Sequence, residues 1–169
     1  FSKLSALNPV FRETGSVTAG NSAGMNDAAA AVVVMSAEYA KTHSLVPKMR
    51  WVGRSVSGVD PQIMGAGPVP AVRKLLAKTS MSLGDIDLIE LNEAFAAQAL
   101  HVIRELNLDE SITNVNGSGI SLGHPLGATG AIMAIKLMYE LERRDIQFGL
   151  ATLCVGGGQG VATIFERLN

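Results

Sequence analysis

The sequence predicts a layered α/β domain, in which helices cover a mixed sheet that ends in an antiparallel hairpin. Two patterns indicate this class. Short apolar runs typical of buried strands alternate with longer segments of helical periodicity, and the last two apolar runs are separated only by residues 156–160. So short a link favours a hairpin. With 169 residues, the chain is long enough for one domain with a buried core.

The individual elements follow from the same patterns, taken in chain order. Residues 1–27 carry several glycine, serine and asparagine residues and are expected to form loop with short extended pieces. Strands are expected over residues 28–35, 49–56, 85–91, 149–155 and 161–166, the second of them at a sheet edge. Helices are expected over residues 36–42, 69–78, 92–106 and 131–144. The last helix is apolar on nearly all sides as far as Glu140, which favours a central, buried position.

Composition and charge exclude several classes of function. The formal net charge is −1 and no basic cluster is present, so the chain offers nothing to hold a nucleic-acid backbone. The uncharged runs are too rich in glycine and polar groups to be membrane spans. A single cysteine excludes an internal disulfide, and without a signal-peptide pattern we expect a cytoplasmic protein. The chain begins at Phe1 rather than methionine, so we expect it to be a piece of something longer.

The glycine-rich, uncharged stretch 114–130 is the most unusual part of the sequence. Glycine is costly to order, so a chain keeps it where the backbone turns sharply or another group comes close. His124 stands directly before Pro125, and because proline is favoured at the first position of a helix, we expect the histidine at a helix entrance. Free N–H groups there disfavour imidazolium and favour a neutral ring. The alternative is a strand-to-helix turn whose histidine only satisfies backbone groups.

Three polar residues fall where a predicted strand ends or a predicted helix begins, which is where sites gather in layered α/β folds: Asn92, His124 and Cys154. Cys154 precedes three glycines, so its thiol is a candidate for exposure beside free N–H groups; the alternative is a small buried residue. Asn92 has the alternative role of a helix N-cap. Nucleotide-binding glycine motifs, metal-ligand spacings and a nucleophile elbow around serine are absent from the sequence.

Five motifs together resemble the thiolase family, over nearly the whole chain. Three of them are similar to the C-terminal motifs of thiolases in order and spacing: Asn92-Glu93-Ala94-Phe95, Gly123-His124-Pro125 and Cys154-x-Gly-Gly-Gly-x-Gly. Two further matches are Thr18-Ala19-Gly20-Asn21 and Met64-Gly65-x-Gly67-Pro68-Val69-Pro70. Any one of these motifs is weak, but the set is highly specific.

The resemblance implies the C-terminal half of a thiolase, with residues 1–27 as the end of a loop region and residues 28–169 as the C-terminal domain. It implies an acyltransferase that condenses two acetyl-CoA molecules or cleaves a 3-oxoacyl-CoA with CoA. Coenzyme A thioesters would be the substrates, and no metal or other cofactor is implied. The implied partners are the missing N-terminal half and, in the full-length enzyme, further copies in a homo-oligomer.

The resemblance also implies catalytic roles for particular residues. His124 would activate the nucleophilic cysteine and donate to a thioester oxygen, and Asn92 would hold a water that completes this oxyanion hole. Cys154 would move the proton at the α-carbon, and Gly156 would lend its backbone N–H to a second oxyanion hole. One such donor is worth roughly 3–4 kcal/mol, and a thiol needs only a modest pKa shift to become a usable base. Substrate contacts are expected from Ser22, Met64, Ala94 and Phe95.

Two departures from the family pattern matter for function. Thiolases carry a second cysteine, the acylated nucleophile, in their N-terminal half, and this chain has only Cys154. Many relatives have Asn-Ala-Ser-Gly where residues 21–24 read Asn-Ser-Ala-Gly, so Ser22 is the candidate substitute for a displaced serine. One alternative is a non-catalytic CoA-binding or scaffolding fragment of the same fold. A second, a ketoacyl synthase, uses a pair of histidines where Asn92 and Cys154 stand, which argues against it.

Overall fold

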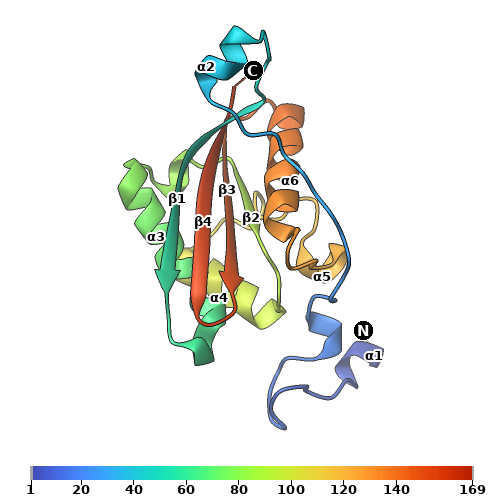
Figure 1. The fold of residues 1–169 in the computed structure, drawn as a ribbon. Helices are drawn as coiled ribbons and strands as arrows, with labels where there is room; N and C mark the ends of the chain where they lie inside the picture. Colours follow the sequence, from blue (N-terminus) through green and yellow to red (C-terminus); the bar gives the residue numbers. More distant parts are fainter. Residues whose placement is uncertain (1, 169) are drawn as a thin grey trace.

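The centre of the protein is a four-stranded mixed sheet, in a computed structural model that describes residues 2–168. Its strands are β1 (Met49–Gly58), β2 (Leu88–Leu91), β3 (Phe148–Val155) and β4 (Gln159–Arg167). They lie in the order β1-β4-β3-β2 (Figure 1). β4 is antiparallel to both of its neighbours, whereas β2 and β3 are parallel. The predictions of a mixed sheet, an edge strand near residue 50 and a C-terminal hairpin are therefore confirmed.

Helices cover both faces of this sheet. In chain order they are α1 (Ser2–Ser5), η1 (Ala19–Asn21), α2 (Ala37–Thr42), η2 (Pro61–Ala66), α3 (Pro68–Thr79), η3 (Leu83–Asp85), α4 (Ala96–Leu106), α5 (Gly119–Leu122) and α6 (Thr129–Arg144). On one face, Leu75 of α3 and Val102 of α4 pack against Leu91 in the larger core. On the other face, Leu137 of α6 packs against Leu88. The sheet is therefore the middle of three layers.

Local sequence explains where several helices begin and end. α3 begins at Pro68, whose fixed φ suits the first helical position. α4 and α6 end at Asn107 and Asp145, which adopt φ of 52° and 55° and so close the last turn. Between residues 2 and 168, no helix combines the length and the apolar character that crossing a membrane requires.

Residues 28–35, predicted as a buried strand, form no strand and lie largely exposed. Val33 and Val34 are each 86% exposed. A strand persists only where a neighbour accepts its backbone hydrogen bonds, and no strand of the described residues pairs with this run. Figure 1 shows it as an extended segment that runs alongside α6 towards α2. The strand prediction is therefore wrong in this structure.

Three further boundaries differ from the sequence-based expectation. The strand predicted from residue 85 begins only at Leu88, because η3 comes first. The helix predicted from Asn92 begins at Ala96. His124 does not stand at a helix entrance, because a turn separates it from α6. In this turn the carbonyl oxygen of Pro125 accepts from two backbone N–H groups. α6 itself is buried along one stripe and only partly covered elsewhere, so the central position predicted for it is not reached within residues 2–168.

Candidate active site

The ends of β2 and β3 bring two of the predicted catalytic residues to one edge of the sheet. The two strands run parallel, so both end at this edge. Asn92 follows β2 directly, and its backbone N–H donates to the carbonyl oxygen of Thr152 at 3.0 Å. Cys154 lies two residues further along β3. Because side chains alternate along a strand, Cys154 is on the same face of β3 as Leu150.

The side chain of Asn92 reaches His124, which a separate loop supplies. Nδ2 of Asn92 lies 3.3 Å from Nε2 of His124. Asn92 is only 1% exposed, and Gly119 packs so closely that a Cβ there would lie 3.0 Å from Oδ1 of Asn92. The N-cap position of α4 is taken by Phe95. The alternative of Asn92 as a helix cap is therefore wrong, and its amide belongs to a polar pair with the histidine.

The hydrogen bonds of His124 determine which ring nitrogen carries the proton. Nδ1 lies 2.7 Å from Oγ1 of Thr129. That hydroxyl donates its only hydrogen to the carbonyl oxygen of Pro125, at 3.0 Å, so it accepts from Nδ1–H of the imidazole. The neutral ring then has its lone pair on Nε2, where it accepts from Nδ2 of Asn92. Nε2 is therefore the nitrogen that can take up a proton.

The position and charge of His124 are also set from outside the ring. Its backbone N–H donates to the carbonyl oxygen of Gly24 and to Oδ1 of Asn26, both at 3.1 Å. Burial lowers the pKa of His124, so the neutral ring is favoured at neutral pH. The sequence predicts this direction correctly, but the cause is desolvation rather than a helix entrance, because α6 begins only at Thr129.

The segment 22–26 joins three of the four predicted substrate-binding residues to the histidine. Ser22 forms a β-bridge with Phe95, and the residue after Ser22 donates its N–H to the carbonyl oxygen of Ala94 at 2.9 Å. The hydroxyl of Ser22 donates to the carbonyl oxygen of Thr18 at 2.7 Å, so in this chain it closes the turn around η1.

An open depression of about 470 Å³ lies between residues 25–30 and 124–128, with His124 in its wall. Neither Met64 nor Cys154 lines it. Met64 lies in η2, and the next residue, Gly65, packs against Gln98 of α4. The structure thus brings together Asn92, His124, Ser22, Ala94 and Phe95 and leaves Met64 and Cys154 outside that group. No group of three or more His, Cys, Asp or Glu side chains within residues 2–168 is arranged to hold a metal ion.

The thiol of Cys154 is buried rather than exposed. Cys154 is 7% exposed, and burial raises the pKa of its thiol. The glycines that follow have different roles. A Cβ on Gly160 would lie 2.0 Å from the backbone of Gly67, so this close crossing requires glycine, whereas a Cβ on Gly156 would meet nothing within 4 Å. The packing of the described residues does not require glycine at position 156, and its backbone is open to an approaching group.

Three residues that hold the Asn92–His124 pair are not among the predicted site residues: Asn26, Asn114 and Thr129. Asn114 and Thr129 lie within the glycine-rich stretch, where a polar side chain among glycines and apolar residues is the only signal that could have pointed to them. Asn26 contacts His124 across 98 positions of sequence, so no local pattern could have identified it.

The described residues thus form an α/β domain with a mixed sheet, an Asn92–His124 pair beyond the end of β2 and Cys154 near the end of β3. Residues 45–167 match the description "Thiolase, C-terminal domain", and residues 1–38 match "Thiolase, N-terminal domain". The chain therefore belongs to the thiolase family.

The relatives to which the chain is similar include acetyl-CoA acetyltransferases and 3-ketoacyl-CoA thiolases. The chain is 53% identical to the acetyl-CoA acetyltransferase of Paracoccus denitrificans over 95% of its own length and 41% of the relative. It is 51% identical to the mitochondrial 3-ketoacyl-CoA thiolase of Bos taurus over 98% of its own length and 42% of the relative. Among solved structures, the Bacillus anthracis acetyl-CoA acetyltransferase has a TM-score of 0.96 and 57% identity, covering 99% of this chain and 42% of that one. Human mitochondrial 3-ketoacyl-CoA thiolase in complex with CoA has a TM-score of 0.92 and 46% identity, covering 99% and 43%. The chain thus spans less than half the length of these relatives.

Proposed function

We propose that this chain supplies one half of a thiolase active site, in which coenzyme A thioesters exchange acyl groups. The reaction is either the condensation of two acetyl-CoA molecules or the cleavage of a 3-oxoacyl-CoA by CoA. The observation that carries the proposal is the contact between Nδ2 of Asn92 and Nε2 of His124, at 3.3 Å. The acetyltransferase and thiolase names of the relatives, one of them solved with CoA, support this substrate class.

In the acyl-transfer step, His124 acts as the base. The lone pair on Nε2 removes the proton of a nucleophilic thiol, the thiolate attacks the thioester carbonyl carbon, and CoA leaves as a thiolate that takes the proton back. The lowered pKa keeps the ring neutral before this step, and Thr129 accepts from Nδ1–H in both protonation states. Because Cys154 is the only thiol of the chain, we assign the nucleophile to an N-terminal thiolase half.

In the carbon–carbon step, Cys154 moves the proton at the α-carbon. Removing that proton turns the thioester into an enolate, whose oxygen needs aimed donors. We assign them to a water held by Nδ2 of Asn92 and to His124 in the form that carries a hydrogen on Nε2. The backbone N–H of Gly156 is assigned to a second oxyanion hole. Burial raises the pKa of Cys154, so the thiol keeps its proton at rest. That form protonates the enolate carbon during cleavage and is left as a thiolate. In condensation the reverse step starts from the thiolate of Cys154, which takes the proton from the α-carbon and becomes the thiol again.

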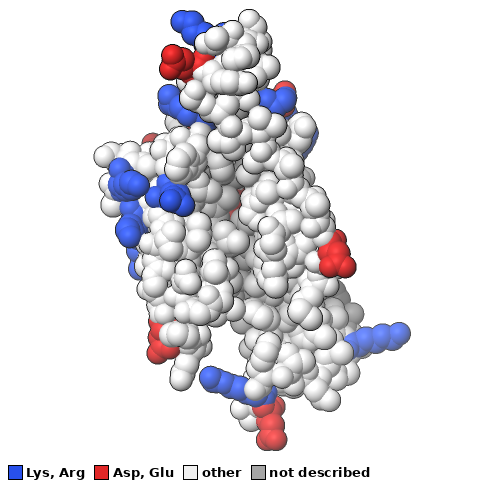
Figure 2. All heavy atoms as spheres, viewed as in Figure 1, with Lys and Arg blue, Asp and Glu red and all other residues white. Residues whose placement is uncertain are grey.

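The partner that completes the site is, in this proposal, an N-terminal thiolase half. Exposed apolar side chains support it: Met25 is 92% exposed, and Val33 and Val34 are each 86% exposed. On the face of the molecule drawn in Figure 2, charged side chains lie mostly near the rim and few lie in the middle. Apolar surface of this kind marks an interface. We further propose a cytoplasmic setting, supported by the lone cysteine, and a homo-oligomer for the full-length enzyme.

The experiment measures cleavage of acetoacetyl-CoA by CoA, with the purified chain alone and in an equimolar mixture with an N-terminal thiolase half, called here the mixed enzyme. We expect no turnover by the chain alone and turnover by the mixed enzyme that is lost in His124→Ala. His101→Ala is the matched control, because His101 lies exposed on α4. Turnover by the chain alone that His124→Ala abolishes would contradict the need for a second thiol. No turnover with a correctly folded partner half would favour a non-catalytic CoA-binding module instead.

A further inference from the structure

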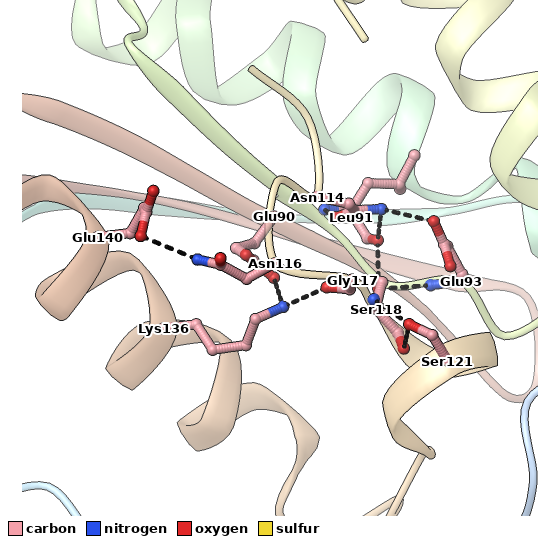
Figure 3. A network of polar contacts seen from close by, with 10 residues as sticks. All are labelled: Glu90, Leu91, Glu93, Asn114, Asn116, Gly117, Ser118, Ser121, Lys136 and Glu140. Carbon is pink, nitrogen blue, oxygen red and sulfur yellow. Dashed lines mark hydrogen bonds and ion pairs between the residues drawn. The ribbon is translucent and has the colours of Figure 1, made fainter. Parts of the chain in front are cut away.

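A polar network holds the end of β2, and its residues have no role in the chemistry proposed above (Figure 3). Residues 112–114 run along the outer edge of β2. Ile89 N–H donates to the carbonyl oxygen of Ile112 at 2.9 Å, and Asn114 N–H donates to the carbonyl oxygen of Ile89 at 2.8 Å. At Asn114 the backbone turns away from the strand, with φ of 53°. Two residues after Ile89 along β2, Leu91 therefore has no peptide group beside it on this edge.

The side chain of Asn114 takes the place of that peptide group. Its Oδ1 accepts from the backbone N–H of Leu91 at 2.8 Å, and its Nδ2 donates to the carbonyl oxygen of Leu91 at 2.8 Å. The same Nδ2 donates to Oε1 of Glu93 at 3.0 Å. A carboxamide offers the donor and acceptor of a peptide bond, so the ladder continues to the residue just before Asn92.

Ser118 holds the peptide groups on both sides of Asn92. Its hydroxyl donates to the carbonyl oxygen of Leu91 at 2.9 Å and accepts from the backbone N–H of Glu93 at 3.2 Å. Ser118 is 5% exposed, so water does not compete well for these bonds. On the other side, the backbone N–H of Asn92 donates to Thr152 on β3 at 3.0 Å. A strand end held on one side alone opens easily.

The loop that carries Asn114 and Ser118 is itself fixed to α6. Nδ2 of Asn116 donates to Oε2 of Glu140 at 2.9 Å. Lys136 donates to the carbonyl oxygen of Gly117 and pairs at 2.6 Å with Glu90, which is 1% exposed. The same loop continues through α5 to His124, so one short segment sets the positions of both members of the catalytic pair.

We propose that Asn114 and Ser118 are positioning residues for acyl transfer. They fix the peptide groups on either side of Asn92 and so hold its amide on Nε2 of His124. The inference rests on the proposed function of that pair, but its test has a readout that needs no turnover.

The test compares Asn114→Gly with Asn116→Ala in the ¹⁵N-labelled chain. Glycine adopts the positive φ of position 114 without strain, so Asn114→Gly removes only the side-chain amide. Asn116→Ala is the matched control, because it removes an amide of the same loop that binds Glu140 rather than the strand end. Ser118→Ala is the second variant, and it decides the question if Asn114→Gly does not fold.

In Asn114→Gly and in Ser118→Ala, we expect the side-chain amide signals of Asn92 to move to the position of a solvent-exposed amide. The titration midpoint of His124 should rise towards the usual value of about 6.5, because the neutral Nε2 loses the donor that stabilises it. Asn116→Ala should leave the amide signals of Asn92 and the titration midpoint of His124 unchanged, even where it lowers the melting temperature. In the mixed enzyme, kcat should fall, by up to about 100-fold for a misplacement of about 1 Å, with KM nearly unchanged.

Three results would overturn the inference. The first is a lower melting temperature in Asn114→Gly and Ser118→Ala with no change at Asn92 or His124, since the network would then be structural only. The second is an equal shift in Asn116→Ala. The third is a further shift in the titration midpoint of His124 when Asn114→Gly is added to Asn92→Ala. A positioning residue that acts through Asn92 has no effect once that amide is gone. If the mixed enzyme has no turnover while the signals shift as expected, the proposed function fails and the positioning role stands.

Discussion

Thr129→Val is expected to change which nitrogen of His124 carries the proton in the neutral ring. Valine is close to threonine in shape but has no hydroxyl, so the substitution removes the group that accepts from Nδ1–H at 2.7 Å. Thr129 is 5% exposed, and water does not readily replace its hydroxyl. Nδ1–H is then left without an acceptor in a partly buried site.

The cost of that loss determines the size of the effect. A buried donor without a partner costs about 1–3 kcal/mol, and a difference of 1–2 kcal/mol changes a ratio of states by roughly 5- to 30-fold. The neutral ring no longer leaves Nδ1–H unpaired if its proton moves to Nε2, although Nε2 then loses the bond that it accepts from Nδ2 of Asn92. Imidazolium cannot avoid the unpaired Nδ1–H, because both of its nitrogens carry hydrogen. We therefore expect the pKa of His124 to fall further and acyl transfer by the mixed enzyme to slow.

The assay is the ¹⁵N chemical shift of the two imidazole nitrogens, recorded against pH in the chain alone. In the unsubstituted chain, Nδ1 should have the shift of a protonated nitrogen and Nε2 that of an unprotonated one. Thr129→Val should reverse the two shifts, and the control Thr129→Ser, which keeps the hydroxyl, should not. If Nδ1 remains protonated to the same extent in Thr129→Val, the hydroxyl does not set the tautomer and the reasoning is refuted.

The remaining predictions concern pH, the thiol and the glycine loop. A hydrogen bond from Arg143 lowers the pKa of Glu140 to about 2. The contribution of Glu140 to stability is therefore complete above its usual pKa of about 4.5 and is lost as the pH falls towards 2. Glu140→Gln should flatten this part of a plot of unfolding free energy against pH, and an unchanged plot would count against this prediction. Because the pKa of His124 is lowered, acyl transfer by the mixed enzyme should decline only below about pH 6.5; a decline that begins above this pH would show a raised pKa instead. Cys154→Ser should preserve acyl transfer and abolish carbon–carbon chemistry, because a hydroxyl is a far weaker base; equal losses in both steps would remove the separate role of the thiol. Gly156→Ala should leave the melting temperature nearly unchanged while reducing turnover. Gly160→Ala should destabilise the fold, since its Cβ would lie 2.0 Å from backbone atoms. A lower melting temperature for Gly156→Ala than for Gly160→Ala would contradict this prediction.

Much of the fold could be predicted because it depends on local patterns. The hairpin of β3 and β4 follows from two apolar runs and a short glycine link, and α3 follows from an apolar stripe after a proline. Residues 28–35 show where such patterns stop being sufficient. Their apolar character favours a strand, but a strand also needs a neighbouring strand, and none of the described residues supplies one.

The candidate site could be predicted only as a set of motifs. Asn92 follows a predicted strand and His124 precedes a proline, which makes both of them candidates, and the structure pairs them. The groups that hold them could not be predicted in the same way. Thr129 sets the tautomer through a hydrogen bond inside one turn, and Asn114 reaches Leu91 only because its own backbone turns away with a positive φ. Such contacts depend on three-dimensional geometry rather than on spacing.

The most direct test of the proposed half-site is to find which thiol holds the acyl group. The mixed enzyme is treated with acetyl-CoA, quenched in acid and analysed by mass spectrometry of both chains. We expect one acetyl group on the N-terminal half and none on Cys154. The rate of acetylation should fall in His124→Ala and remain nearly unchanged in Cys154→Ser. An acetyl group on Cys154, formed at a rate that depends on His124, would contradict the division of roles between the two halves.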